Sequence, residues 1–224
     1  MRLKTAVVFL TLSLVCLISR VSFADSLTLS NVGGASTDGF YVDPYIFTIT
    51  GPGGTSTLVD MSCLNFDREV AIGSSWNANP VSVASIGSNG IDGEPLVDFL
   101  ADAYLYNQYA TAVGNAQLTS DIQFAIWSIM DPSLTEANTD GALNANAQAL
   151  AADALSAVPN LPSSYFANDM VYIPSGDYPP GSEPQIFMTD PPPSASAPEP
   201  ASLILLGTGL LGAVAVMRRR RGKV

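Results

Sequence analysis

The sequence contains no histidine, and lysine is absent from the whole stretch between residues 25 and 200. Without histidine, Cys-His pairs and Ser-His-Asp triads are excluded, and without lysine so are Schiff bases and Ser-Lys dyads. Zinc sites need several Cys and His ligands, so we expect neither such a metal site nor a cofactor. Only carboxylates remain for catalysis, as in glycoside hydrolysis, and we expect no enzyme activity and no catalytic residues.

Positive charge is nearly absent between residues 25 and 200, where Arg68 is the single cationic side chain against all 20 carboxylates. This excludes nucleic acid as a partner, because phosphate binding needs a basic surface. Strong acidity suits an extracellular protein that repels its own copies. Carboxylates are also calcium ligands, but no loop has the spacing Asp-x-Asp-x-Asp-Gly.

Residues 1–24 have the pattern of a secretory signal peptide. Arg2 and Lys4 precede an apolar run over residues 6–18, and small residues lie at the positions that a signal peptidase inspects. We expect cleavage between Ala24 and Asp25, so Cys16 would be discarded with the signal peptide.

The other end of the chain has three consecutive parts. A linker rich in proline covers residues 191–200 and an apolar run covers residues 201–217. A basic cluster ends the chain within residues 201–224 and contains Arg218, Arg219, Arg220 and Arg221. The apolar run is slightly shorter than the roughly 20 residues that span a bilayer, and the arginines would hold its far end on the cytoplasmic side. An ordinary C-terminal membrane anchor would explain this pattern.

The linker also contains Pro198, Glu199 and Pro200. The order Pro-Glu-Pro, short apolar helix and arginine cluster resembles the PEP-CTERM sorting signal of Gram-negative bacteria. The resemblance implies processing by an exosortase near the Pro-Glu-Pro, and a place on the cell surface, in the outer envelope or in the exopolysaccharide matrix of a biofilm. Before processing, residues 201–217 would hold the protein in the membrane.

Residues 25–190 remain as one exported domain, which is long enough to form a core. Alternating or β-rich segments predict strands at residues 26–31, at 40–50 with a break at Pro44, at 55–61, at Trp76 with the run 80–86, and at 170–173 and 185–188. Helical spacing predicts a helix from Pro95, a second helix capped at Thr119, Ser120 or Asp121 and ended by Pro132, and a third over residues 141–158. This order of strands, helices and strands predicts an α+β fold: an antiparallel β-rich domain with an inserted helical segment.

Cys63 is the only cysteine of the exported domain. Outside the inner membrane, such a cysteine is buried and inert, paired between molecules, or used chemically. A buried, inert residue is a reasonable interpretation, because cysteine behaves as a small hydrophobe. Gln123, in turn, would be explained as a surface residue that lies against the Trp127 indole one helical turn away.

The segment from residue 121 to 127 suggests chemical use of this thiol. Gln123, Ala125, Ile126 and Trp127, with Phe124 between them, resemble the Thr-Gln-x-Ala-Ile-Trp motif in the thioester domains of bacterial surface adhesins. In that family, a cysteine on an early strand forms a thioester with this glutamine, which implies a Cys63–Gln123 cross-link here. Ile122 replaces the family's threonine, and Ser62 stands where an aromatic residue or leucine is usual.

These patterns predict an exported cell-surface or matrix protein that acylates a partner amine or hydroxyl through the thioester. The absence of lysine would prevent self-acylation. One alternative is a non-covalent structural or binding protein of the exopolysaccharide matrix, with a free thiol. A second is a glycosidase that uses a carboxylate pair among Asp60, Asp67 and Glu69.

Overall fold

The computed structural model describes residues 24–34, 36–37, 39–42, 44–134, 145–179 and 181–190. All of these residues fall in the first of the chain's two units, which ends at Pro191. The predicted signal peptide up to residue 23, the linker, the Pro-Glu-Pro motif, the apolar run and the basic cluster lie outside the described residues. Among the helices of the described ranges, none has the length and apolar character that crossing a membrane requires.

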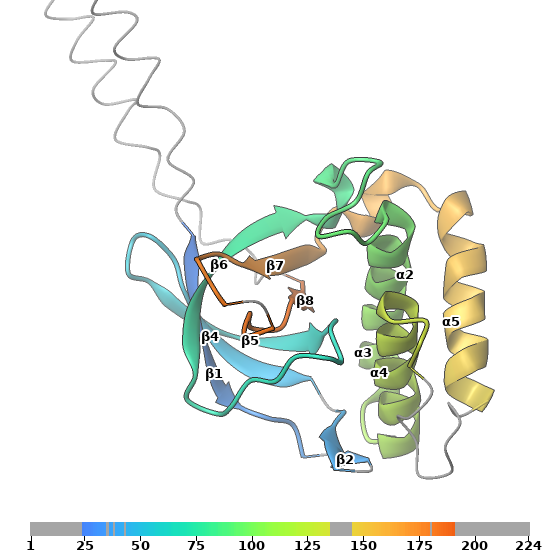
Figure 1. The fold of residues 1–224 in the computed structure, drawn as a ribbon. Coiled ribbons are helices and arrows are strands. Elements are labelled where there is room, and N and C mark those ends of the chain that lie inside the picture. The colour runs from blue at the N-terminus through green and yellow to red at the C-terminus, as the bar shows by residue number, and fades with distance from the viewer. Residues whose placement is uncertain are drawn as a thin grey trace, which may run out of the picture. The chain divides into compact units, whose positions relative to one another are not determined.

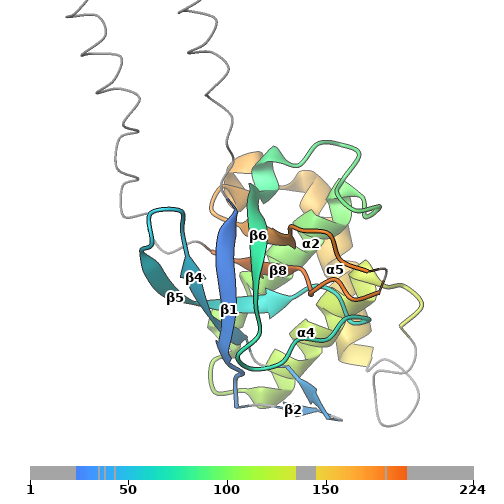
Figure 2. The same ribbon diagram turned by 60° about the vertical axis from the view of Figure 1, so that its left-hand side comes forward.

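Antiparallel strands form a closed barrel with the order β1-β4-β5-β8-β7-β6 (Figure 1). The strands are β1 (Asp25–Asn31), β4 (Tyr45–Thr50), β5 (Ser56–Cys63), β6 (Ser75–Ser82), β7 (Met170–Pro174) and β8 (Phe187–Thr189). Figure 2 shows β1 at the front with β4 and β6 beside it. Closure gives every strand of the barrel two neighbours, so none of them is an edge strand along its whole length.

Alternating side chains fill the barrel. Tyr45, Phe47 and Ile49 of β4 are buried while the residues between them are half-buried. The ring of Phe47 packs against those of Phe187 and Trp76, with centroid distances of 4.5 Å and 5.6 Å. This period of two is the signal from which strands at residues 26–31 and 40–50 were predicted.

The helices lie between β6 and β7 in the sequence and form two layers beside the barrel (Figure 1). They are α2 (Leu96–Tyr106), α3 (Tyr109–Ala112), α4 (Ala116–Met130) and α5 (Ala145–Ala157). Helices α2 and α4 lie next to the barrel, and α5 covers them from outside. Because α4 is covered on both sides, nearly every residue from Thr119 to Met130 is buried.

Short elements complete the described chain: strands β2 (Ser36–Thr37) and β3 (Phe40–Tyr41), and 3-10 helices η1 (Val83–Ser85), η2 (Val158–Asn160) and η3 (Ser163–Phe166). Strands β2 and β3 pair only with each other, as a small antiparallel sheet. A hydrogen bond of 2.9 Å from Ser120 Oγ to Thr37 Oγ1 ties this small sheet to α4.

The α+β prediction is confirmed as a β-rich antiparallel domain with inserted helices, but several boundaries differ. Residues 40–50 form β3 and β4, which belong to different sheets, and the last strand begins at Phe187, not at residue 185. The strand placed at residues 80–86 runs instead over Ser75–Ser82, and Pro80 lies inside it. Proline is tolerated there because β1 pairs with β6 only as far as Ala78, so at Pro80 that side of the strand has no partner.

The start of the second helix was also placed too late. Helix α4 begins at Ala116, and Asn115 caps it by accepting a 3.2 Å hydrogen bond from the Leu118 amide. Thr119 lies inside the helix and donates its hydroxyl to the Asn115 carbonyl. The prediction placed the N-cap at Thr119, Ser120 or Asp121, whereas the residue that caps the helix is Asn115, four positions before Thr119.

Candidate functional site

Cys63 and Gln123 are brought together at the contact between the barrel and the helices. Cys63 is the last residue of β5, and Gln123 lies near the middle of α4. Both are completely buried, and Gln123 Nε2 donates a 2.7 Å hydrogen bond to the Cys63 carbonyl. The explanation of Gln123 as a surface residue is therefore wrong, because α4 is covered on both sides.

Two hydroxyl groups hold the other end of the Gln123 carboxamide. Ser62 Oγ and Tyr109 Oη each donate a 3.0 Å hydrogen bond to Gln123 Oε1. Ser62 precedes the cysteine on β5, and Tyr109 opens α3, so the donors come from opposite sides of the contact. With both acceptor positions of Oε1 filled and Nε2 bound to the Cys63 carbonyl, the amide has a fixed orientation against the cysteine backbone.

The Cys63 thiol donates a 3.1 Å hydrogen bond to the Asn65 carbonyl. Burial is the main reason why its pKa rises to about 12; the Trp127 indole and Asn65 oppose this rise, and the charges of Asp67 and Asp102 add to it. Trp127 Nε1 has no hydrogen bond of normal geometry to any residue that the structure describes, yet it lies near enough to the sulfur to lower the thiol pKa. The resting group is therefore a neutral thiol.

Asn65 fixes the turn that follows β5. Its side-chain Oδ1 accepts a 2.7 Å hydrogen bond from the Ile186 amide, and its carbonyl accepts a 2.9 Å hydrogen bond from Gln185 Nε2. These contacts join the turn to the segment that leads into β8, the strand whose Phe187 pairs with Cys63. The thiol is thus positioned by two strands that are far apart in the sequence.

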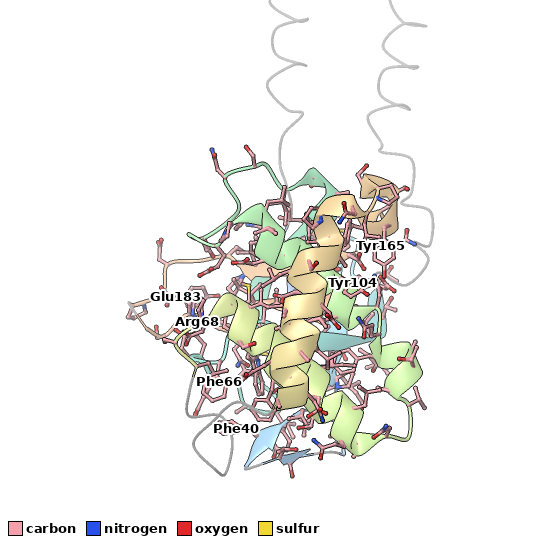
Figure 3. The ribbon with its side chains drawn as sticks, turned by 90° about the vertical axis from the view of Figure 1, so that its right-hand side faces the viewer. Phe40, Phe66, Arg68, Tyr104, Tyr165 and Glu183 are labelled. Atoms are coloured by element: carbon pink, nitrogen blue, oxygen red, sulfur yellow. The ribbon has the colours of Figure 1, made fainter. Side chains whose placement is uncertain are left out.

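Aromatic rings cover the pair. The Trp127 ring packs against Phe66 and Phe124 at centroid distances of 5.1 Å and 5.2 Å, and Phe40 of β3 packs on Phe66 at 4.8 Å. In Figure 3, Phe40 and Phe66 lie close together below Arg68. Trp127 itself is only 2% exposed. This cover would keep water from a reactive acyl group.

Asp102 of α2 is a further charged group close to the thiol, near enough to raise its pKa. Its side chain is completely buried, and neither carboxylate oxygen has a hydrogen-bond partner among the described residues. Burial, followed by the charges of Asp98 and Glu94, raises the pKa of Asp102 well above its ordinary value. A carboxyl group in this setting favours the protonated form.

A cleft of about 340 Å³ opens beside the same turn. Its lining residues are Asn65, Phe66, Asp67, Arg68, Asp92, Glu94, Met130, Asp131 and Ile186. Asn65 binds the thiol and Phe66 packs on Trp127, so the cleft reaches the covering residues of the Cys63–Gln123 pair. An incoming nucleophile would meet a surface that carries four carboxylates and one guanidinium.

The structure does not gather the three carboxylates suggested for glycoside hydrolysis. Asp67 lines the cleft just described, Glu69 lines a separate hollow near Trp76 and Tyr178, and Asp60 lines neither. In the described part of the chain, no group of three or more Cys, Asp or Glu side chains is placed to hold a metal ion.

Sequence reasoning identified the Cys63–Gln123 pair and its neighbour Trp127, and Ala125 and Ile126 are buried on the same helix. It missed Tyr109, Asn65 and Asp102, and it took Ser62 only as a departure from a motif. A lone aspartate among Phe99, Ala101, Ala103 and Leu105 was a signal that could have been used, because a carboxyl in an apolar helix face is unusual.

Comparison with known proteins gives one match to a family description, the PEP-CTERM protein-sorting motif, over residues 196–221. No curated protein matches the sequence.

Solved structures that are similar to this chain include three thioester domains. The N-terminal thioester domain of a surface protein from Clostridium perfringens is 16% identical, with a TM-score of 0.40, over 75% of this chain and 98% of that one. The thioester domain of the fibronectin-binding protein SfbI from Streptococcus pyogenes is 14% identical, with a TM-score of 0.40, over 78% and 97%. That of a protein F2 like fibronectin-binding protein from Streptococcus pneumoniae is 12% identical, with a TM-score of 0.43, over 74% and 92%.

Because these TM-scores are low, the assignment of the site rests on the contacts of Cys63 and Gln123. The chain carries a PEP-CTERM sorting motif and is structurally similar to N-terminal thioester domains of bacterial surface proteins.

Proposed function

We propose that this chain is an exported surface protein that forms a thioester between Cys63 Sγ and Gln123 Cδ and uses it to attach itself covalently to a partner. The observation that carries the proposal is the fixed Gln123 carboxamide, buried against the Cys63 carbonyl and held by hydrogen bonds to Cys63, Ser62 and Tyr109.

The chemistry balances without any further reactant. The sulfur attacks Gln123 Cδ, the new C–S bond replaces the C–N bond, and the amide nitrogen leaves as ammonia with the thiol proton. Attack requires the thiol to release its hydrogen bond to the Asn65 carbonyl and turn toward the amide. An outside amine or hydroxyl would later take the acyl group and return the proton to the sulfur.

This is a single-use attachment, not catalytic turnover, because Gln123 stays bonded to the partner. Two features suit it: the buried, aromatic-covered pair, which limits hydrolysis, and the absence of lysine between residues 25 and 200. The acceptor on this account is an amine-bearing ligand or a hydroxyl of surface polysaccharide.

The sorting motif supports the proposed location. A PEP-CTERM motif implies export and processing by an exosortase, which fits a protein that acts on the surface or in the matrix of a Gram-negative bacterium. Before processing, residues 201–217 would be held in the membrane.

A second candidate function is a non-covalent structural or binding protein of the exopolysaccharide matrix. The hydrogen bond from the thiol to Asn65 and the thiol pKa of about 12 favour it, because a buried and satisfied cysteine needs no reactive role.

Methylamine separates the two functions. The wild-type protein should gain methylamine on Gln123 and expose one thiol at Cys63, as read by intact mass and a thiol reagent. Cys63→Ala should gain nothing under the same conditions. A wild-type protein that takes up no amine, and whose thiol is free from the start, would favour the non-covalent function.

A further inference from the structure

The two hydroxyl groups on Gln123 Oε1 have a geometry that packing alone does not require. We propose that Ser62 and Tyr109 are an oxyanion-binding pair that catalyses both the formation of the thioester and its transfer to a partner. This inference rests on the proposed function and assigns roles to two residues that the motif does not contain.

The first argument is position. Both hydroxyl oxygens lie 3.0 Å from Oε1, within the range of about 2.7–3.1 Å at which donors stabilise an oxyanion. When the sulfur attacks Cδ, the carbonyl electrons move onto Oε1, and that is the atom that both hydroxyls already face. The hydrogen bonds would therefore strengthen as negative charge develops.

The second argument is rigidity and burial. Ser62 and Gln123 are completely buried and Tyr109 is 9% exposed, so little water competes for Oε1. One donor is fixed by strand pairing to Met188 and the other by α3, which means that neither has to be ordered during the reaction. Donors held in a dry site stabilise charge far better than water does.

Tyr109 also remains a donor over the whole useful pH range. Burial raises its pKa well above the ordinary value, and the nearby Ser62 hydroxyl opposes this only in part. The phenol therefore remains a hydrogen-bond donor to Oε1 at neutral pH.

One oxygen serves both steps. In formation, the C–S bond forms, charge collects on Oε1, and the C–N bond then breaks to release ammonia. In transfer, an amine nitrogen forms a new bond to Cδ, charge collects again on Oε1, and the C–S bond breaks as the sulfur regains a proton. Oε1 stays on Gln123 throughout, so the same two hydroxyls act twice.

The test is the rate of methylamine addition to the full chain, followed by intact mass, in Tyr109→Phe and Ser62→Ala. Each variant should react about 10²–10³-fold more slowly than wild type, the range for loss of one oxyanion donor, or should fold without losing ammonia at all. The matched controls are Tyr106→Phe, which removes a hydroxyl bonded to the Asp60 carbonyl, and Ser128→Ala, whose hydroxyl binds the Ala125 carbonyl. Both controls should stay within about threefold of wild type.

The carbonyl stretch of the thioester in labelled Gln123 gives a second readout, which loss of packing would not move. In Ser62→Ala this stretch should shift to higher frequency, because one hydrogen bond to Oε1 is lost. Ser62→Ala therefore tests the inference even if Tyr109→Phe does not fold. Equal rates in the variants and their controls, or an unshifted stretch, would overturn the roles of Ser62 and Tyr109 while leaving the thioester intact. A wild-type protein without ammonia loss would overturn both the inference and the proposed function.

Discussion

At the scale of single residues, the buried carboxyl of Asp102 is the most costly group that the structure shows. It has no hydrogen-bond partner among the described residues, and an unsatisfied buried polar group costs about 1–3 kcal/mol. Asp98, one helical turn earlier, adds a like charge on the same face of α2. Asp102 therefore lowers the stability of the fold close to Cys63 and Gln123, the pair that carries the proposed chemistry.

Asp102→Asn should stabilise the domain at neutral pH, because the amide cannot ionise and the free-energy cost of burying an ionisable carboxyl group is removed. The folded-state pKa is raised above the ordinary value of 3.8, so the native state binds more protons than the unfolded chain, and the wild type loses stability as pH rises from about 4 toward the raised pKa. The gain in the variant should shrink toward pH 4. Urea unfolding at pH 4 and pH 7 measures it, and a variant less stable than wild type at pH 7 would contradict this account.

The thiol of Cys63 should lose its proton only at high pH. In Gln123→Ala, where no thioester forms, alkylation by iodoacetamide should rise about tenfold per pH unit through pH 10 without levelling, because burial holds the pKa near 12. In the urea-unfolded variant, the alkylation rate of the same thiol should level off near pH 9, which is the ordinary pKa of this group. A plateau near pH 9 in the folded variant would show that the thiol is open to solvent.

At the scale of elements, the small β2–β3 sheet completes the cover over the reactive pair. Phe40 on β3 is 38% exposed and touches both Phe66 and Trp127, with ring centroids 4.8 Å and 6.2 Å away. The cover is anchored to α4 by Ser120 and Thr37.

Phe40→Ala should speed hydrolysis of the thioester several-fold, because it opens the aromatic cover to water. Tyr41→Ala is the matched control, since Tyr41 lies on the same strand, is 47% exposed, and has its carbonyl, not its side chain, bonded to Tyr45. Hydrolysis adds one water to the thioester, so the increase of the intact mass over time measures its rate. Equal rates in the two variants would show that the β2–β3 sheet does not exclude water.

Local patterns predicted most elements but not how they meet. The alternation at Leu27 and Leu29 and the spacing of Ile122, Ala125, Ile126 and Ile129 gave correct strands and a correct buried helix face. Closure of the barrel was not predictable, because β5 pairs with β8 across more than a hundred residues and no local pattern reports such a pairing. The Ser62 and Tyr109 donors were missed for the same reason, since they converge on Gln123 from two different elements.

At the scale of the whole molecule, the thioester would join the barrel to the helical layer. It would close a loop of 60 residues between Cys63 and Gln123, for which the chain-entropy estimate is about 4 kcal/mol of stabilisation. Opening the thioester with methylamine should therefore lower the melting temperature by roughly 10 °C.

Calorimetry of wild-type protein before and after methylamine measures this stabilisation, with Cys63→Ala treated in parallel as the control for methylamine itself. The control should not change its melting temperature. An equal shift in both proteins would mean that methylamine acts on the fold and not on a cross-link.

The central claim is tested most directly by the intact mass of the purified chain, with Cys63→Ala prepared in the same way. We predict that the wild type is lighter than its calculated mass by one ammonia and that Cys63→Ala has its full calculated mass. A wild-type chain at full calculated mass, with a thiol that reacts once the protein is unfolded, would contradict the thioester.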